Sequence, residues 1–134
     1  MDLRLTPKKL CGNVTVPASK SMCHRMVIAA ALSDGTSRVN GLSISEDITA
    51  TLQAVAALGA EYTLNGGSVV IGKGKKPQSV PLLDCGESGS TLRFLIPAAL
   101  ALTGEACFTG HGRLMERPMG PYVELFGRKG IVFE

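Results

Sequence analysis

The sequence predicts an α+β fold built from repeated βαβαββ units, with one complete unit and most of a second within its 134 residues. Strand and helix patterns follow the same order over about residues 12–75 and again over about residues 80–134. In addition, two apolar helices open alike. Each has a hydroxyl-rich start, an arginine one turn in, and an Ala-Ala-Leu strip at the same offset beyond that arginine. We therefore expect an internal repeat of roughly 60–70 residues.

The first unit opens with valines that alternate with a polar residue over 14–16, which predicts a strand ending at Pro17. A helix should start within residues 19–21 and stop before Gly35, because glycine interrupts the helical pattern there. Residues 36–40 then predict a second strand.

Ser45 is a suitable N-cap for the second helix, since its side-chain oxygen can accept a free backbone N–H. The acidic Glu46 and Asp47 follow in the first turn, where negative charge is favoured, and Gly59 ends the helix. The buried stripe of this helix consists of apolar residues at helical spacing: Ile48, Leu52, Val55 and Leu58. A hairpin follows, with a glycine turn at residues 65–68.

The second unit repeats this order. Its predicted elements are a strand over 82–85, a helix over 88–102, a strand over 106–109, a loop rich in glycine and arginine, a helix through Tyr122, Leu125 and Phe126, and a strand at Ile131. Gly130 occupies the place that Gly59 has in the first unit. The second unit breaks off before its hairpin, so we expect the chain to be a fragment.

The composition argues against several classes of protein. A net charge of +3 suits an anionic ligand but is far below the basic loading of a nucleic-acid binder. The longest apolar run, residues 94–102, is too short to span a bilayer, and the opening residues lack the layout of a signal peptide. The four cysteines are scattered, without a Cys-x-x-Cys pair or clustered histidines. We expect a cytoplasmic protein with reduced cysteines, no metal site, and no membrane or nucleic-acid partner.

Both of the similar helix starts suggest sites for phosphate or carboxylate groups. A helix N-terminus presents free N–H groups and the positive end of the helix dipole to an anion. At the first start, Lys20, Ser21 and Arg25 can converge on one anion. Asp47 could also touch a ligand, although its place in the first turn of a helix explains it without one.

The second start offers a different set of donors. Gly89 lets a ligand approach the backbone closely, Ser90 adds a hydroxyl, and Arg93 can make a two-pronged contact with a carboxylate or phosphate. Arg117 precedes Pro118, which favours an extended conformation from which the arginine can reach across a cleft. No acid–base pair or nucleophile stands out, so the residues by themselves assign no catalytic group.

Three segments carry a more specific signal: Pro17-Ala18-Ser19-Lys20-Ser21 with Arg25, Asp84-Cys85-Gly86-Glu87-Ser88-Gly89-Ser90-Thr91-Leu92-Arg93, and Leu114-Met115-Glu116-Arg117-Pro118-Met119-Gly120. In order and spacing they resemble the 5-enolpyruvylshikimate-3-phosphate (EPSP) synthase family of enolpyruvyl transferases. The resemblance runs over essentially the whole chain. It implies that residues 1–134 are an N-terminal portion, the first third or so of a complete family member.

The resemblance implies transfer of the enolpyruvyl group of phosphoenolpyruvate to the 5-hydroxyl of shikimate 3-phosphate, with release of phosphate. It implies that Lys20 contacts both substrates and that Ser21 and Arg25 hold shikimate 3-phosphate. For phosphoenolpyruvate, with which the herbicide glyphosate competes, it implies further contacts from Gly89, Arg93 and Arg117. No cofactor or metal is implied.

The family fold has two globular halves, each of three βαβαββ units, with the active site in the cleft between them. The resemblance implies that the first strand of this chain belongs to the far half, and that the remainder of the polypeptide is a packing partner. The family's proton-transfer acids lie outside the matched segments. We therefore expect no catalytic residue within this chain, and no turnover by the chain alone.

Two positions depart from the family pattern. Where many members have Asn-Ala-Gly-Thr-Ala, this chain has Glu-Ser-Gly-Ser-Thr over residues 87–91, and Phe94 replaces the usual proline. Glu87 adds a negative charge beside the proposed anion site.

Two other functions stay open at this point. One is the related transferase that acts on UDP-N-acetylglucosamine. The other is a non-catalytic phosphate- or RNA-binding module, which would bind polynucleotides with a steep salt dependence.

Overall fold

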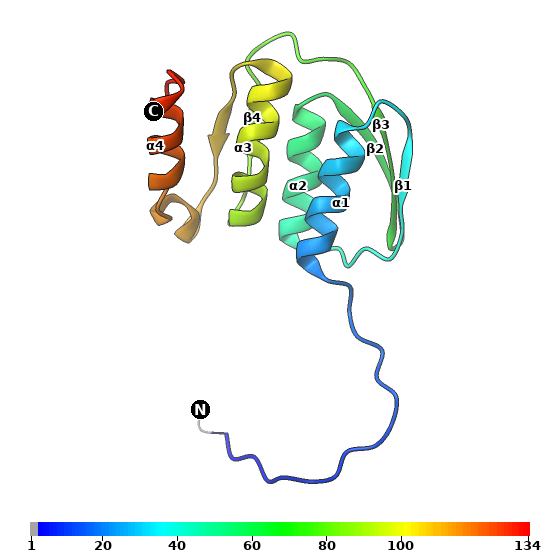
Figure 1. Ribbon diagram of the computed structural model, residues 1–134. Coiled ribbons are helices and arrows are strands. Elements are labelled where there is room, and N and C mark those ends of the chain that lie inside the picture. Colours follow the sequence, from blue (N-terminus) through cyan, green and yellow to red (C-terminus); the bar gives the residue numbers. More distant parts are fainter. Residues whose placement is uncertain (1–2) are drawn as a thin grey trace.

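A computed structural model describes residues 3–134 (Figure 1). Residues 3–19 form an extended arm without helix or strand, which leads into the folded body at Lys20. The elements of the body are α1 (Lys20–Leu32), β1 (Ser37–Val39), α2 (Glu46–Ala57), β2 (Ala60–Asn65), β3 (Ser68–Lys73), β4 (Leu82–Asp84), α3 (Gly89–Thr103), β5 (Cys107–Thr109), the 3-10 helix η1 (Gly112–Glu116) and α4 (Gly120–Arg128). The predicted α+β class is confirmed.

The helices start where the sequence predicts them to start. Ser19, Ser45 and Ser88 are the N-caps of α1, α2 and α3, and each side-chain oxygen accepts a backbone N–H from the first turn. All four α-helices begin at the same end of the body, the lower end in Figure 1. Four sets of free helix N–H groups therefore point toward one side of the molecule.

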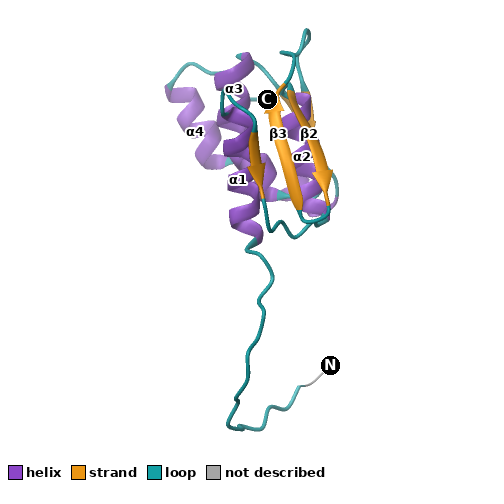
Figure 2. Cartoon of the chain, turned by 90° about the vertical axis from the view of Figure 1, so that its right-hand side faces the viewer, coloured by secondary structure: helices purple, strands orange, loops and turns teal. Residues whose placement is uncertain are grey.

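The strands form two separate sheets. In the first, β3 lies between β1 and β2 and pairs antiparallel with both, in the order β1-β3-β2. Asn65 pairs with Ser68, so the predicted glycine turn closes the hairpin. Figure 2 shows this sheet in front with the helices behind it, on one face only. The second sheet consists of β4 and β5, which run parallel.

One hydrophobic core joins the two predicted units. The stripe predicted for α2 is confirmed, because Ile48, Leu52 and Val55 are buried, while Leu58 is half-buried and packs against them. The same cluster includes Leu83 on β4 and residues of α3 such as Leu95 and Ala99. Since α2 contacts both α1 and α3, it holds the starts of these helices at fixed positions relative to each other.

Two predicted strands are wrong. Residues 14–16 form no strand, and Val14 and Val16 are 86% and 77% exposed on the arm. The predicted strand at Ile131 is also absent, since the Ile131 N–H donates to the Phe126 carbonyl and the chain folds back over α4. A strand needs a hydrogen-bonding neighbour, and within residues 3–134 neither segment lies beside one.

The order of the elements follows the predicted repeat apart from these two strands. The boundaries of the two units, about 12–75 and about 80–134, stay a prediction. None of the helices within residues 3–134 combines the length and the apolar character needed to cross a bilayer.

Candidate functional site

The candidate site lies at the end of the body where the helices begin. The loop from β4 to α3 and the loop from β5 to η1 leave the carboxyl ends of two parallel strands, so they emerge on the same side. In open α/β sheets, ligands bind in the crevice outside the carboxyl ends of the strands. The free N–H groups of α1, α2 and α3 face the same side.

The first predicted group lies on α1. The Lys20 ammonium forms an ion pair with the Asp47 carboxylate at the start of α2. The Arg25 guanidinium donates to the Ser21 carbonyl at 3.0 Å and lies 5.0 Å from the centre of the Phe94 ring. This cation–π contact links α1 to α3, because Arg25 lies on α1 and Phe94 lies on α3, next to Arg93. Asp47 therefore has a defined partner in this group.

A buried chain of polar side chains connects the starts of three helices. His24 Nδ1 lies 2.7 Å from the Thr51 hydroxyl, and Thr51 lies 2.7 Å from the Thr91 hydroxyl. Thr91 in turn lies 2.7 Å from the side chain of Ser88, the N-cap of α3. All four residues are buried. The chain runs from α1 through α2 to α3 and fixes the separation between the two predicted anion groups.

His24 has one hydrogen-bond partner at its ring. Nδ1 pairs with the Thr51 hydroxyl, which also lies 3.0 Å from the Asp47 carbonyl. Nε2 is buried and has no hydrogen-bond partner within residues 3–134. Burial lowers the pKa of His24 and outweighs the Asp47 carboxylate, which raises it. The ring is therefore neutral in the folded chain at neutral pH.

Sequence reasoning missed this polar chain. It singled out neither His24 nor Thr51. The available signal was weak: Thr51 and Thr91 are hydroxyl residues within otherwise apolar helix faces. A buried hydroxyl needs a partner, but the sequence does not show which partner it has.

The second predicted group brings α3 and η1 together. A Cβ placed on Gly89 would lie 2.5 Å from Arg117 Nη1, so the guanidinium lies directly against the Gly89 backbone. Arg93 Nη2 donates to the Pro118 carbonyl at 3.4 Å, and the Tyr122 hydroxyl donates to the Arg93 carbonyl at 2.8 Å. The predicted partners Gly89, Arg93 and Arg117 thus share one region. Ser90 is half-buried beside them in the first turn of α3.

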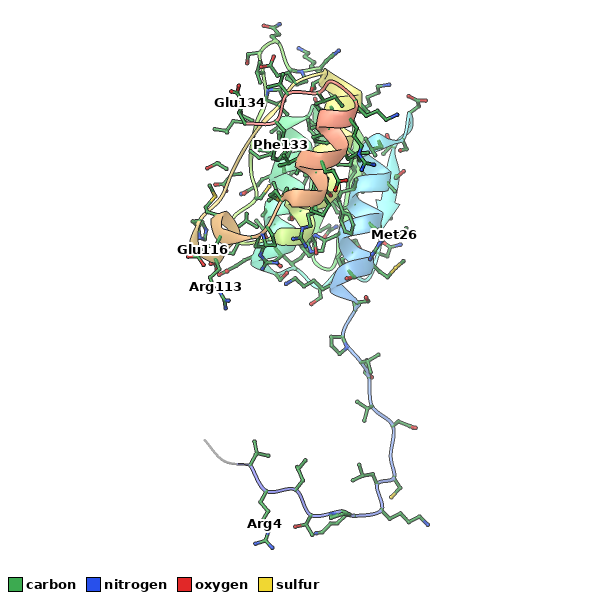
Figure 3. The ribbon with its side chains drawn as sticks, turned by 60° about the vertical axis from the view of Figure 1, so that its left-hand side comes forward. Arg4, Met26, Arg113, Glu116, Phe133 and Glu134 are labelled. Carbon is green, nitrogen blue, oxygen red and sulfur yellow. The ribbon has the colours of Figure 1, made fainter. Side chains whose placement is uncertain are left out.

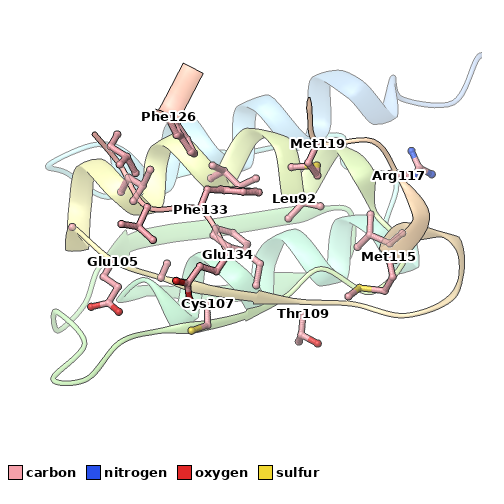
Figure 4. A pocket seen from close by; sticks show the side chains of 18 of the residues that line it. Leu92, Glu105, Cys107, Thr109, Met115, Arg117, Met119, Phe126, Phe133 and Glu134 are labelled. Atoms are coloured by element: carbon pink, nitrogen blue, oxygen red, sulfur yellow. The ribbon is translucent and has the colours of Figure 1, made fainter. Parts of the chain in front are cut away.

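A cavity of about 780 Å³ lies beside this region, between α3, β5, α4 and the C-terminal residues (Figure 4). Apolar side chains such as Leu92, Phe126 and Phe133 line most of it, and Arg117 stands at one rim. Of the predicted binding residues, only Arg117 contributes to its lining. Within residues 3–134, histidine, cysteine and acidic side chains form no group of three that could hold a metal ion.

Comparison with known proteins identifies the family. A family model described as EPSP synthase (3-phosphoshikimate 1-carboxyvinyltransferase) matches residues 5–133. The chain belongs to the EPSP synthase family. Relatives named 3-phosphoshikimate 1-carboxyvinyltransferase from Clostridium beijerinckii and Clostridium kluyveri are 41% and 44% identical to it, over 98% and 97% of its length. The EPSP synthase structure from Acinetobacter baumannii matches 90% of this chain with a TM-score of 0.73 and 32% identity.

The chain spans about a third of the length of the curated relatives it matches, 32% for Clostridium beijerinckii and 31% for Clostridium kluyveri. It covers 28% of the Acinetobacter baumannii chain. The family predicted from the three sequence segments is confirmed. The ligand that each of the predicted site residues would hold stays a prediction.

Proposed function

We propose that this chain is the N-terminal part of an enzyme that transfers the enolpyruvyl group of phosphoenolpyruvate to shikimate 3-phosphate and releases phosphate. One observation carries the proposal. Within a chain of the EPSP synthase family, two groups of cationic residues sit at neighbouring helix starts, and α2 ties them together. Both substrates are small multiply charged anions, which such helix starts suit.

The two substrates are assigned to the two groups. Lys20, Ser21 and Arg25 on α1 would hold shikimate 3-phosphate. Phosphoenolpyruvate, and glyphosate in its place, would bind between α1 and α3, with contacts from Lys20, Gly89, Arg93 and Arg117. Ser90 and Asp47 are included as further residues at the substrate site, without assignment to one of the two substrates. The close approach of Arg117 to the Gly89 backbone supports this assignment, because a carboxylate there could accept from both.

Proton transfer is assigned to other parts of the full-length polypeptide. No catalytic residue is assigned within residues 1–134, and no cofactor. The remainder of the polypeptide would pack against this part and complete the cleft. Four free cysteines, of which Cys11 and Cys107 are exposed, fit a reducing compartment, and we place the protein in the cytoplasm.

A chimera tests the proposed function. Residues 1–134 replace the matching third of the Clostridium beijerinckii enzyme, and phosphate release is measured with phosphoenolpyruvate and shikimate 3-phosphate. We expect turnover by the chimera and none by the isolated chain. Turnover with UDP-N-acetylglucosamine as acceptor instead, or turnover by the isolated chain, would contradict the proposal.

Two substitutions in the chimera test the residue assignments separately. Arg25→Ala should raise the KM for shikimate 3-phosphate by about tenfold or more and change that for phosphoenolpyruvate little, because each lost charged hydrogen bond weakens binding by about that factor. Arg117→Ala should have the opposite selectivity. Equal losses for both substrates from each substitution would count against the assignment.

A further inference from the structure

Two loops at the candidate site are held together by contacts in register. The loop after β4 and the loop after β5 run side by side. The contacts occur in order along both: the Cys85 N–H donates to the Thr109 carbonyl (2.9 Å), the His111 N–H to the Gly86 carbonyl (3.0 Å), and the Arg113 N–H to Glu87 Oε1 (3.0 Å). The first two are backbone pairs. Only the third uses a side chain, that of Glu87.

Glu87 caps η1 from outside. The residue before η1, His111, makes no side-chain hydrogen bond to the first turn, so the helix has no cap of its own. The Glu87 carboxylate takes this place and accepts the Arg113 N–H, although the two residues are 26 positions apart. Gly112 leaves room for it, because a Cβ on Gly112 would overlap the carboxylate. The fit between Glu87 and this loop is therefore specific.

The other end of η1 carries Arg117. The Arg117 N–H donates to the Leu114 carbonyl at 3.1 Å, so the last turn of η1 fixes the Arg117 backbone. From there the guanidinium reaches the Gly89 backbone. η1 thus connects Glu87, at its start, to Arg117, at its end. In Figure 3, Arg113 and Glu116 project from η1 at the outer edge of the body, so only the backbone of Arg113 faces Glu87.

We propose that Glu87 is a positioning residue, which holds Arg117 against Gly89 by capping η1. The inference rests on the proposed function, in which Gly89 and Arg117 bind phosphoenolpyruvate. It also changes the meaning of the acidic departure from the family pattern. The Glu87 carboxylate, whose negative charge lies beside the proposed anion site, accepts the Arg113 N–H at 3.0 Å. Through this hydrogen bond Glu87 supports the position of Arg117.

Three substitutions separate the hydrogen bond from the charge. Glu87→Gln removes the charge but keeps an oxygen at the same reach, so it should retain the cap. Glu87→Asp keeps the charge but is one methylene shorter, so it should lose the cap. Glu87→Ala loses both. A role of the charge alone predicts the reverse order, with the Asp variant like the unmodified chain and the Gln variant like the Ala variant.

The first readout is NMR on the 134-residue chain. We expect hydrogen exchange of the Arg113 amide to accelerate by about tenfold in the Ala and Asp variants and by less than about twofold in the Gln variant. The Gly89 amide resonance should shift in the same two variants, because the Arg117 guanidinium lies against it. Unchanged Arg113 exchange in the Asp variant would overturn the proposal, and this comparison holds even if the Ala variant does not fold.

The second readout is kinetic and uses the chimera. Glu87→Asp should raise the KM for phosphoenolpyruvate by about tenfold and leave the KM for shikimate 3-phosphate within about twofold. Glu87→Gln should leave the KM for phosphoenolpyruvate close to that of the unmodified chimera. Glu116→Gln is the matched control, since it removes a charge from η1 that makes no hydrogen bond or ion pair within residues 3–134. An equal effect of the control would overturn the proposal. A chimera without turnover would refute the proposed function, while the Arg113 exchange still decides the role of Glu87.

Discussion

Thr51 is the residue on which the buried polar chain depends most, and Thr51→Val tests that chain directly. Valine has nearly the same shape, so the substitution removes a hydroxyl and leaves little cavity. His24 Nδ1 loses the hydrogen-bond partner that lies 2.7 Å away, and the His24 side chain is only 1% exposed. Thr91 loses a second partner at 2.7 Å but keeps Ser88.

The expected loss follows from these contacts. A buried polar group left without a partner costs about 1–3 kcal/mol. His24 bears the full cost and Thr91 a smaller one, so we expect the free energy of unfolding to fall by about 2–4 kcal/mol. Domains of this size are stable by only about 5–15 kcal/mol, so the loss is a large part of the total. It corresponds to a fall in Tm of about 10 °C.

Urea unfolding followed by circular dichroism measures this loss. The midpoint should fall by about 1–2 M urea with an unchanged slope. Thr63→Val on the exposed face of β2 is the matched control, because it makes the same chemical change at the surface and should stay within about 0.5 kcal/mol. A loss for Thr51→Val no larger than that of the control would refute the stabilising role of the polar chain.

Three further predictions concern pH, the glycine at the site and the thiols. Burial lowers the pKa of His24 below its usual 6.5, so the unfolded chain takes up a proton first as the pH falls; stability should be complete above pH 6.5 and decline below it. Melting curves at several pH values should show this slope in the unmodified chain, and the same slope in His24→Asn would contradict the assignment. Gly89→Ala should displace Arg117, which a Cβ would meet at 2.5 Å, and raise the KM for phosphoenolpyruvate in the chimera by about tenfold while the melting temperature changes little. A thiol reagent should label the exposed Cys11 and Cys107 quickly and should label the buried Cys23 and Cys85 only after urea is added. Burial also raises the pKa of Cys85 to about 11, which slows its reaction further. Peptide mapping of the label measures this order, and early labelling of Cys85 would contradict the packing of β4.

The sequence predicted the features that depend on neighbours along the chain. Ser19, Ser45 and Ser88 cap their own helices through N–H groups three residues away, so a local pattern was enough to place the helix starts. The hairpin turn at residues 65–68 and the buried stripe of α2 follow from backbone preference and helical spacing in the same way. The family motifs are also contiguous segments, and they were sufficient to identify the EPSP synthase family.

Only the tertiary structure decided the features that depend on distant partners. Residues 14–16 have the pattern of a strand, but a strand exists only beside another, and none lies there within residues 3–134. Thr51 became the centre of a polar chain because α1 and α3 pack on either side of α2. Glu87 and the Arg113 amide meet across 26 positions because two parallel strands end together. Spacing along the chain fixes what a residue can do locally, while packing determines which distant group it meets.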